Sequence, residues 1–341
     1  MHTPEVSVCV PTYNGAAFLG STLESIAAQT FEDFEVLIVD DQSTDATIAV
    51  AESYAASDAR ARVIRNAERA GSSARNANQC LRHARGRWIK FLFQDDLMAP
   101  SCLARMLDAG RQRGQLVMAW HDFVFEPDVD ETVRRFYESP LSLATTLPGT
   151  AASADAVCDA VLSHWGVNFI GPTSASLIHR DCVARHGSFH SEIRDFPDLE
   201  YWIRVGNRDG LAIVPERLVT FRVHGSSISA RIRDERRAHP ALPLDPLRLL
   251  LAFARAPEYA NLRHRALRRD PPVDPEQLLR SLAFETRWLA ADVRYRRRTA
   301  ALVEQWEAFC SQHPEMHALL RDIDASMSRW AKAKRWVKGK L

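Results

Sequence analysis

The sequence predicts an α/β fold in which a mostly parallel sheet is followed by a C-terminal α-helical region. Three observations lead to this prediction. Short apolar runs alternate with helical patterns from residue 6 to residue 96, which is the order of βαβ units. After residue 240, apolar residues recur at helical spacing. The 341 residues are 46% hydrophobic and carry 44 Lys and Arg against 43 Asp and Glu, which is typical of a globular chain.

The first part of the chain divides into predicted strands and helices that alternate. β-branched and aliphatic runs predict strands at residues 6–10, 35–39, 62–65 and 88–93. Helical spacing of apolar residues predicts helices at residues 18–29, 45–56 and 73–84. Ser43 or Thr44 is expected to cap the second helix, because a side-chain oxygen can accept a bond from a free backbone N–H there.

The middle of the chain is less regular, and ordered elements return after it. A strand is expected at residues 118–125, an ordered run at 174–178, a helix at 197–209, and strand-like runs at 211–214 and 218–223. A polar, arginine-rich joint at residues 229–239 follows, and we place the domain boundary there. The predicted domains are therefore residues 1–232 and residues 233–341.

Several classes of protein are excluded or disfavoured by what the sequence lacks. No G-x-G-x-x-G follows the first strand, and neither a P-loop nor a G-x-S-x-G elbow occurs. The apolar runs are too short to cross a bilayer, and the N-terminus does not resemble a secretory signal. The six cysteines are scattered and are interpreted as reduced thiols. We therefore expect a cytoplasmic protein without structural disulfides.

Polar residues gather at the ends of three predicted strands. These ends carry Thr12-Tyr13-Asn14, Asp40-Asp41 and Asp95-Asp96. Ligands of open α/β sheets bind beyond the carboxyl ends of the strands, so these residues are candidates for one site. Carboxylates suit Mg²⁺ or Mn²⁺ shared with substrate phosphates, although an Asp pair can also simply end a strand.

Longer stretches of the sequence favour a metal-binding role for the Asp pair over a role in ending the strand. Residues 6–47, 69–76 and 86–96, and then residues 174–193, 196–205 and 215–229, resemble in order the family 2 glycosyltransferases, which are inverting enzymes of the GT-A fold. The resemblance covers roughly residues 5–230. It implies that residues 1–232 form a nucleotide-sugar-dependent catalytic domain. It also implies a divalent cofactor, Mn²⁺ or Mg²⁺.

The resemblance implies roles for the first set of candidate residues. Pro11, Thr12 and Tyr13 match the loop that packs the nucleotide base, and Asp41 matches the acid that binds the base edge, with Asp40 as its support. Arg75 matches a basic residue near the nucleotide, the alternative being an ordinary surface arginine. Asp95 matches the residue that contacts the sugar nucleotide, and Asp96 matches the metal ligand. The family pattern is Asp-x-Asp-Asp, and here Phe93 occupies its first position.

A second set of residues matches the later part of the family pattern. Asp198 matches the general base, which would take a proton from the acceptor hydroxyl. Its alternative role is helix capping alone, and Glu200 is the second candidate for the base. Pro197 replaces the glutamate that precedes the base in the family. Arg222 and His224 match a loop that closes over the diphosphate, where His224 could bind the metal or a phosphate, or could simply be solvated.

The implied activity is transfer of a sugar from a UDP- or dTDP-type donor to a saccharide or lipid-linked acceptor, in bacterial surface polysaccharide synthesis. The rival interpretation is an inactive binding or scaffold protein that keeps the same shape, because Phe93 and Pro197 depart from the pattern. No motif indicates nucleic-acid binding.

The C-terminal segment carries a separate signal. Apart from Lys90, every lysine lies in the last ten residues, and residues 328–341 contain basic residues and no acid. Trp330, Ala333, Val337 and Leu341 share one stripe of a predicted helix. A basic amphipathic helix of this kind is typical of a helix that lies on an anionic membrane surface. We therefore expect peripheral association with the inner face of the cell membrane, the alternative being a solvated tail.

Overall fold

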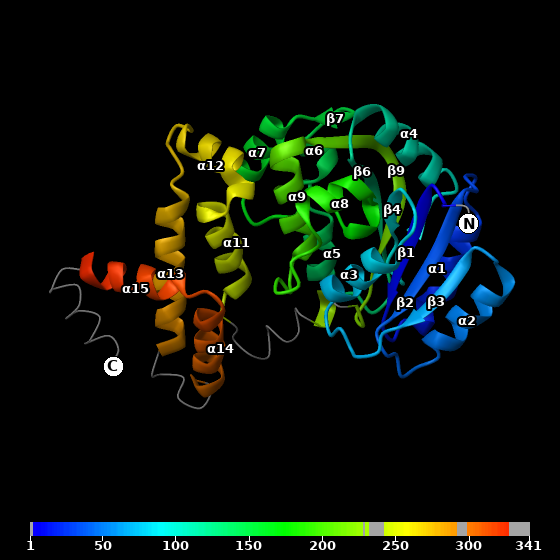
Figure 1. Ribbon diagram of the computed structural model, residues 1–341, viewed down its shortest axis with the longest axis horizontal. Coiled ribbons are helices and arrows are strands. Elements are labelled where there is room, and N and C mark those ends of the chain that lie inside the picture. Colours follow the sequence, from blue (N-terminus) through cyan, green and yellow to red (C-terminus); the bar gives the residue numbers. More distant parts are fainter. Residues whose placement is uncertain (1–2, 228, 232–241, 292–298, 327–341) are drawn as a thin grey trace. The chain divides into compact units, whose positions relative to one another are not determined.

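The computed structural model describes residues 3–227, 229–231, 242–291 and 299–326. In this part of the chain the strands form one nine-stranded sheet with the order β3-β2-β1-β4-β8-β6-β9-β5, and β7 pairs with β9 (Figure 1). The strands are β1 (Val6–Thr12), β2 (Phe34–Asp40), β3 (Ala61–Arg65), β4 (Trp88–Phe91), β5 (Leu97–Met98), β6 (Leu116–Phe125), β7 (Ala151–Ala152), β8 (Ser176–His179) and β9 (Leu211–Val223).

The first four strands are parallel, as predicted. β1 lies between β2 and β4, and every residue of these three strands is buried. Continuous burial is expected of parallel strands that are covered on both faces, and it explains why their sequences are apolar runs without alternation. β8 then pairs antiparallel with β4 and with β6, and β6 pairs parallel with β9. The carboxyl ends of β1, β2 and β4 therefore lie at one edge of the sheet.

Helices connect these strands. They are α1 (Ala16–Ala27), α2 (Thr47–Ser57), α3 (Ser73–His83), α4 (Cys102–Arg113), α5 (Glu131–Tyr137), α6 (Leu143–Thr146), α7 (Ala154–Ser163), α8 (Arg180–His186) and α9 (Pro197–Asp209), with a short 3-10 turn, η1 (Thr173–Ala175). The main core contains apolar side chains of β1, β2, α1 and α4. The predicted cap of the second helix is wrong: α2 begins at Thr47, and the Ser43 hydroxyl instead donates to Asp40 at 2.5 Å.

The chain divides into two compact units, Met1–Arg231 and Ile232–Leu341. The described part of the second unit consists of helices, which confirms the expected helical C-terminal region. They are α11 (Leu244–Arg255), η2 (Pro257–Tyr259), α12 (Ala260–Leu267), α13 (Pro275–Ala291), α14 (Thr299–Gln312) and α15 (Glu315–Ser326). Its buried side chains include Leu247, Phe253, Leu279, Phe309 and Met316.

Two further sequence expectations concern membranes and thiols. Among the described residues, no helix has the length and apolar character needed to cross a bilayer. The predicted membrane-surface helix, residues 328–341, lies outside the described residues. All six cysteines are free and buried, as predicted.

Candidate functional site

The ends of β1 and β4 are joined by a side chain that the sequence analysis passed over. The Gln94 amide accepts a hydrogen bond from the backbone N–H of Tyr13 at 2.7 Å and donates one to its carbonyl at 3.1 Å. Gly15 leaves room for this amide, because a Cβ at that position would lie 2.2 Å from it. The position of Gln94 immediately before Asp95-Asp96, at a strand end, was the available signal.

The predicted base-binding loop presents one aromatic ring. Pro11 and Thr12 are buried in β1, whereas Tyr13 keeps part of its surface exposed. The Arg69 guanidinium lies 4.1 Å from the centre of the Tyr13 ring. A ring with a cation on one face is a suitable surface for stacking a nucleotide base.

Asp41 organises the loop that follows β3. Its carboxylate accepts hydrogen bonds from the Asn66 side chain at 2.9 Å, from the Gly71 N–H at 3.0 Å and from the Ala70 N–H, and it is 4% exposed. Asp40 holds the turn that follows β2 by accepting from the Ser43 N–H at 2.9 Å. The structure thus gives Asp41 a loop-holding role, and its contact with a base stays a prediction.

Arg75 is less closely tied to this edge of the sheet. It lies in the first turn of α3 and is exposed. Its backbone N–H donates to the Ser72 side chain at 3.2 Å, which caps the helix. Its predicted contact with the nucleotide likewise stays a prediction.

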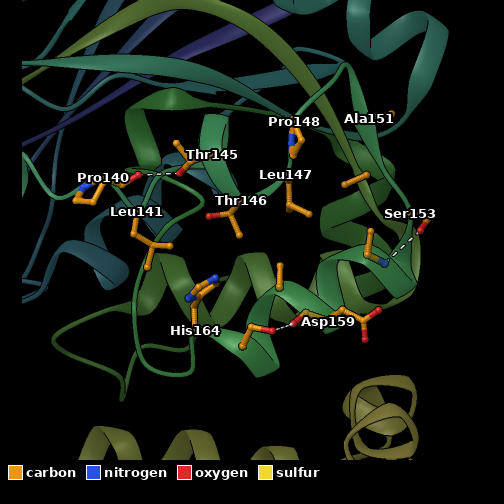
Figure 2. Close-up of a pocket in the computed structure, with 14 residues that line it drawn as sticks. Pro140, Leu141, Thr145, Thr146, Leu147, Pro148, Ala151, Ser153, Asp159 and His164 are labelled. Carbon is orange, nitrogen blue, oxygen red and sulfur yellow. Dashed lines mark hydrogen bonds between the residues drawn. The ribbon is translucent and has the colours of Figure 1, made fainter. Parts of the chain in front are cut away.

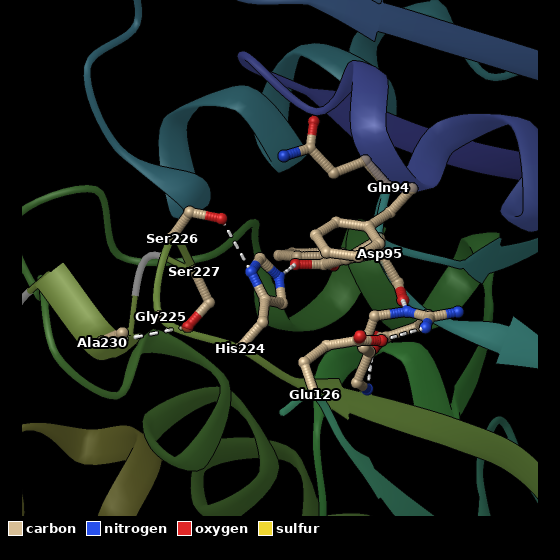
Figure 3. A network of polar contacts seen from close by, with 12 residues as sticks. Gln94, Asp95, Glu126, His224, Gly225, Ser226, Ser227 and Ala230 are labelled. Carbon is tan, nitrogen blue, oxygen red and sulfur yellow. Dashed lines mark hydrogen bonds and ion pairs between the residues drawn. The ribbon is translucent and has the colours of Figure 1, made fainter. Parts of the chain in front are cut away.

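A carboxylate and an imidazole meet beyond the end of β4. Asp95 Oδ2 lies 3.0 Å from His224 Nε2, and His224 Nδ1 lies 2.8 Å from the Ser226 hydroxyl (Figure 3). The Phe18 ring packs on the imidazole, with 4.3 Å between ring centres. His224 is 6% exposed, so it is not the solvated loop histidine of the alternative interpretation.

Arg222 connects this pair to β9 and β6. Its Nε donates to the Asp95 carbonyl at 3.0 Å, and its Nη1 forms an ion pair with Glu126 at 2.5 Å (Figure 3). The guanidinium also lies 5.0 Å from the Phe18 ring centre. The arginine is therefore anchored beside Asp95 and His224, with part of its charge balanced by Glu126.

Asp96 does not point into this site. It is 1% exposed, one oxygen accepts from the Ser174 hydroxyl, and the other accepts from the Arg222 backbone N–H at 3.0 Å. Burial raises the pKa of this carboxyl well above its usual range. Because protein donors enclose this carboxylate, the structure favours Asp95 over Asp96 as a metal ligand, and the sequence-based choice of Asp96 stays a prediction.

Asp95 and His224 fit a divalent cation better. They bring one oxygen and one nitrogen ligand within 3.0 Å of each other. In the described residues, no group of three or more His, Cys, Asp or Glu could hold a metal. Mg²⁺ commonly uses only one or two protein ligands and completes its shell with water and substrate phosphates. The donor set thus suits a cation that is shared with a diphosphate.

Asp198 has the properties of a general base. It lies in the first turn of α9 and is half-buried, and its Oδ2 accepts a hydrogen bond from Asn168 Nδ2 at 3.2 Å. Burial raises its pKa to about 6, although bonds from the Leu199 N–H and from Asn168 act in the opposite direction. A carboxylate with this pKa is ionised near neutral pH and is still basic enough to accept a proton.

Glu200 has a structural environment, which favours Asp198 over Glu200 as the base, and the role of Glu200 as second base stays a prediction. It is fully buried, and Arg204 Nε donates to its carboxylate at 2.8 Å. Trp202 is also fully buried, and its Nε1 donates to the Gly171 carbonyl at 3.0 Å. Both residues stabilise α9 and its surroundings.

One short segment links Asp198 with the Asp95 region. At one end, the Asn168 side chain bonds both Asp198 and the Gly171 carbonyl. At the other end, the Ser174 hydroxyl bonds Asp96. Residues 168–174 therefore bond the candidate base at one end and Asp96, the neighbour of Asp95, at the other.

A separate cavity of about 980 Å³ lies beside α6, α7 and β7 (Figure 2). Its lining is mainly apolar or neutral, with Thr146, Leu147 and His164 pointing toward the same space. None of the sequence-predicted site residues lines it, so it is distinct from the strand-end site.

Comparisons with known proteins show the family of this chain. The sequence model described as Glycosyl transferase family 2 matches residues 7–159. A Mycobacterium tuberculosis protein named uncharacterized protein MT1568 is 30% identical over 234 residues, which are 69% of this chain and 72% of that protein. The succinoglycan biosynthesis protein ExoO of Rhizobium meliloti is 36% identical over 140 residues, or 41% of this chain and 39% of that protein. The uncharacterized glycosyltransferase EpsJ of Bacillus subtilis is 38% identical, but the match spans only 32% of this chain and 31% of EpsJ.

Solved structures share the fold. Residues 1–349 of S. aureus TarS in complex with UDP-GlcNAc give a TM-score of 0.57 at 16% identity, covering 94% of this chain and 88% of that one. The mannosyltransferase PcManGT from Pyrobaculum calidifontis, in complex with GDP-Man and Mn²⁺, gives 0.53 at 20% identity, covering 95% and 87%. At these identities the likeness concerns the fold, and it confirms the expected fold class.

Proposed function

This chain belongs to glycosyl transferase family 2, and we propose that it is an inverting enzyme that transfers a sugar from a nucleotide-diphosphate sugar to an acceptor hydroxyl. The observation that carries the proposal is that residues 168–174 connect two groups, by bonds from Asn168 to Asp198 and from Ser174 to Asp96 beside Asp95. One group is the Asp95–His224 pair, suited to a diphosphate, and the other is Asp198, suited to accepting a proton. A single displacement at the anomeric carbon needs one group that stabilises the leaving diphosphate and another that accepts the proton of the acceptor hydroxyl.

The chemistry assigned to Asp198 follows from its position and its pKa. The acceptor oxygen forms a bond to the anomeric carbon while the bond from that carbon to the diphosphate oxygen breaks. The acceptor proton moves to the Asp198 carboxylate. Because the acceptor attacks the face opposite the leaving diphosphate in a single displacement, the new linkage has the opposite configuration. General-base assistance of this kind contributes about 10²- to 10⁴-fold to a rate.

The diphosphate leaves with negative charge, which the site is built to balance. Asp95 and His224 would hold Mn²⁺ or Mg²⁺, and the bound cation would stabilise the charge on the leaving diphosphate. Arg222 adds a fixed positive charge beside the pair. The chain itself orients these groups through Phe18, Ser226 and Glu126.

The donor and acceptor classes are proposed from smaller clues. The Tyr13 ring and the loop held by Asp41 suit a nucleotide base, and a UDP- or dTDP-sugar is the donor we favour. The relative named for succinoglycan biosynthesis supports a saccharide or lipid-linked acceptor in surface polysaccharide synthesis. Together with the basic segment 328–341, this favours an enzyme on the cytoplasmic face of the membrane.

The test is release of nucleotide from UDP-, dTDP- and GDP-sugars, measured with Mn²⁺ and again after EDTA. We expect release from one donor that requires the cation. Binding of the nucleotide without any turnover would instead support the inactive binding protein that Phe93 and Pro197 suggest. Failure to bind any of the nucleotides would contradict the proposal.

A further inference from the structure

Each residue of the turn that follows β4 is held by a partner from another element. The Phe93 N–H donates to the Ser174 hydroxyl at 3.0 Å, and Gln94 bonds the Tyr13 backbone. Asp95 contacts His224 and Arg222. Asp96 accepts from Ser174 and from the Arg222 N–H. The turn that carries Asp95 therefore has little freedom to move.

Ser174 makes two of these contacts, one at each end of the turn. It lies in η1, is 1% exposed, and its hydroxyl accepts from Phe93 while it donates to Asp96. Its carbonyl accepts from Lys90 Nζ, which also donates to the Phe91 carbonyl at 2.6 Å. Lys90 is fully buried in β4. A buried ammonium requires such acceptors, so Lys90 ties Ser174 to β4 at a second point.

The contacts continue from Asp96 to the strand that carries His224. Asp96 accepts from the Arg222 N–H at 3.0 Å, two residues before His224. In the sheet, β4 and β9 are separated by β8 and β6, so no backbone ladder joins the two strands directly. β5 pairs with β9 at Leu97 and Met98 only. The hydrogen bonds from Ser174 to Asp96 and from the Arg222 N–H to Asp96 add a second connection between the turn after β4 and β9. This connection lies next to the Asp95–His224 pair.

We propose that Ser174 is a positioning residue, which sets the spacing of Asp95 and His224 by holding Asp96 and the Phe93 N–H. Ser174 acts through other residues and is not itself expected to contact the donor. The inference rests on the proposed function, because it assigns Ser174 to the support of the proposed diphosphate and cation site. It also gives Asp96 a role that its enclosed carboxylate can perform.

The chain provides a matched control two residues away. Ser176 is also fully buried, and its hydroxyl donates to the Thr173 carbonyl at 2.7 Å without contacting Asp96. Ser174→Ala and Ser176→Ala each remove one buried hydroxyl from the same segment. A purely structural role would lower the stability of either variant but leave the Mn²⁺-dependent binding of nucleotide by the folded protein the same in both.

The measurement is the dissociation constant of UDP, dTDP and GDP for the full chain, by calorimetry with and without Mn²⁺. We expect Ser174→Ala to weaken Mn²⁺-dependent binding by about 10- to 100-fold, as supporting partners of metal ligands commonly do, and to change binding without Mn²⁺ much less. Ser176→Ala should bind as the native chain does. Ser174→Thr, which keeps the hydroxyl, should restore binding.

The binding measurements distinguish failure of the proposed function from failure of the positioning role of Ser174. If the native chain binds none of the nucleotides with Mn²⁺, the proposed function fails. If it binds one of them and Ser174→Ala binds as well as Ser176→Ala, the positioning role is overturned while the proposed function stands. Should Ser174→Ala not fold, Ser174→Cys replaces it, because a thiol fills the space but is a weak donor; native-like Mn²⁺-dependent binding by that variant would equally overturn the role.

Discussion

Asp95 and His224 are 129 residues apart in the chain, and their side chains meet at 3.0 Å beyond the end of the sheet. Asp95 follows β4, and His224 follows β9, so the contact requires both strands to be in place. Phe18 of α1 closes the pair from one side. A ligand that bridges these two residues would therefore bind the folded catalytic unit and not its separate segments.

The first prediction concerns this pair. Asp95→Asn and His224→Ala should each weaken Mn²⁺-dependent nucleotide binding at least about tenfold, because each removes a proposed cation ligand. Calorimetry with and without EDTA measures the effect. His83→Ala, which changes an exposed histidine in the last turn of α3, is the control and should bind normally. Cation dependence that survives in both site variants would argue against the assignment.

The second prediction concerns Asp198. Asp198→Asn should lower transfer by about 10²- to 10⁴-fold while nucleotide affinity is kept, since the amide cannot accept the proton. Because the pKa of Asp198 is about 6, transfer by the native chain should rise as the pH increases through 6 and the base ionises. Asp181→Asn, in the exposed first turn of α8, is the matched control. A parallel loss of affinity and rate would show that Asp198 is structural.

The third prediction concerns the hydrogen bond from Asn168 to Asp198. Asn168 donates to Asp198 at 3.2 Å, and this bond stabilises the ionised carboxylate. Asn168→Ala should therefore raise the pKa of Asp198 and move the acid side of the pH–rate profile to higher pH. The profile of transfer against pH measures the shift. An unchanged midpoint, or one at lower pH, would contradict the assigned contact.

The fourth prediction tests the structural role of Glu200. Glu200→Gln leaves the Arg204 charge without its buried partner, which should lower the free energy of unfolding by about 3–5 kcal/mol. The turnover rate of the protein that remains folded should not change. Glu216→Gln removes an exposed ion pair with Arg105, which solvent screens, and should lower the free energy of unfolding much less. Denaturant unfolding and rate measurements on the same samples decide between a structural and a catalytic Glu200.

The fifth prediction concerns residues 328–341. Each basic residue near an anionic surface contributes about 1 kcal/mol, and the tryptophans add apolar insertion. The full chain should therefore sediment with anionic liposomes and dissociate as salt is added, whereas a chain that ends before Ser328 should not sediment. Equal sedimentation of the two chains would leave the segment as a solvated tail.

The sequence determined the fold class, and it indicated one edge of the sheet as the place of the candidate site. Apolar runs that alternate with helical patterns can bury their surfaces only as a sheet covered by helices, so β1 to β4 were predictable. Parallel strands place their carboxyl ends on one edge, so Tyr13, Asp41 and Asp95 could be expected near one another. The buried environment of Glu200 was partly foreseeable, because residues 198 and 200 face different sides of a helix and Arg204 lies four residues on.

Only the tertiary structure decided between the two adjacent aspartates. Asp95 and Asp96 are chemically identical and follow the same strand, so local sequence does not show which one faces the ligand. Ser174 and the Arg222 backbone, from distant elements, enclose Asp96, while His224 comes to Asp95. Hydrogen-bond partners that are remote in the chain enclose the Asp96 carboxylate. The Asp95 carboxylate stays available to a ligand. The placement of these partners depends on how β4, η1 and β9 pack.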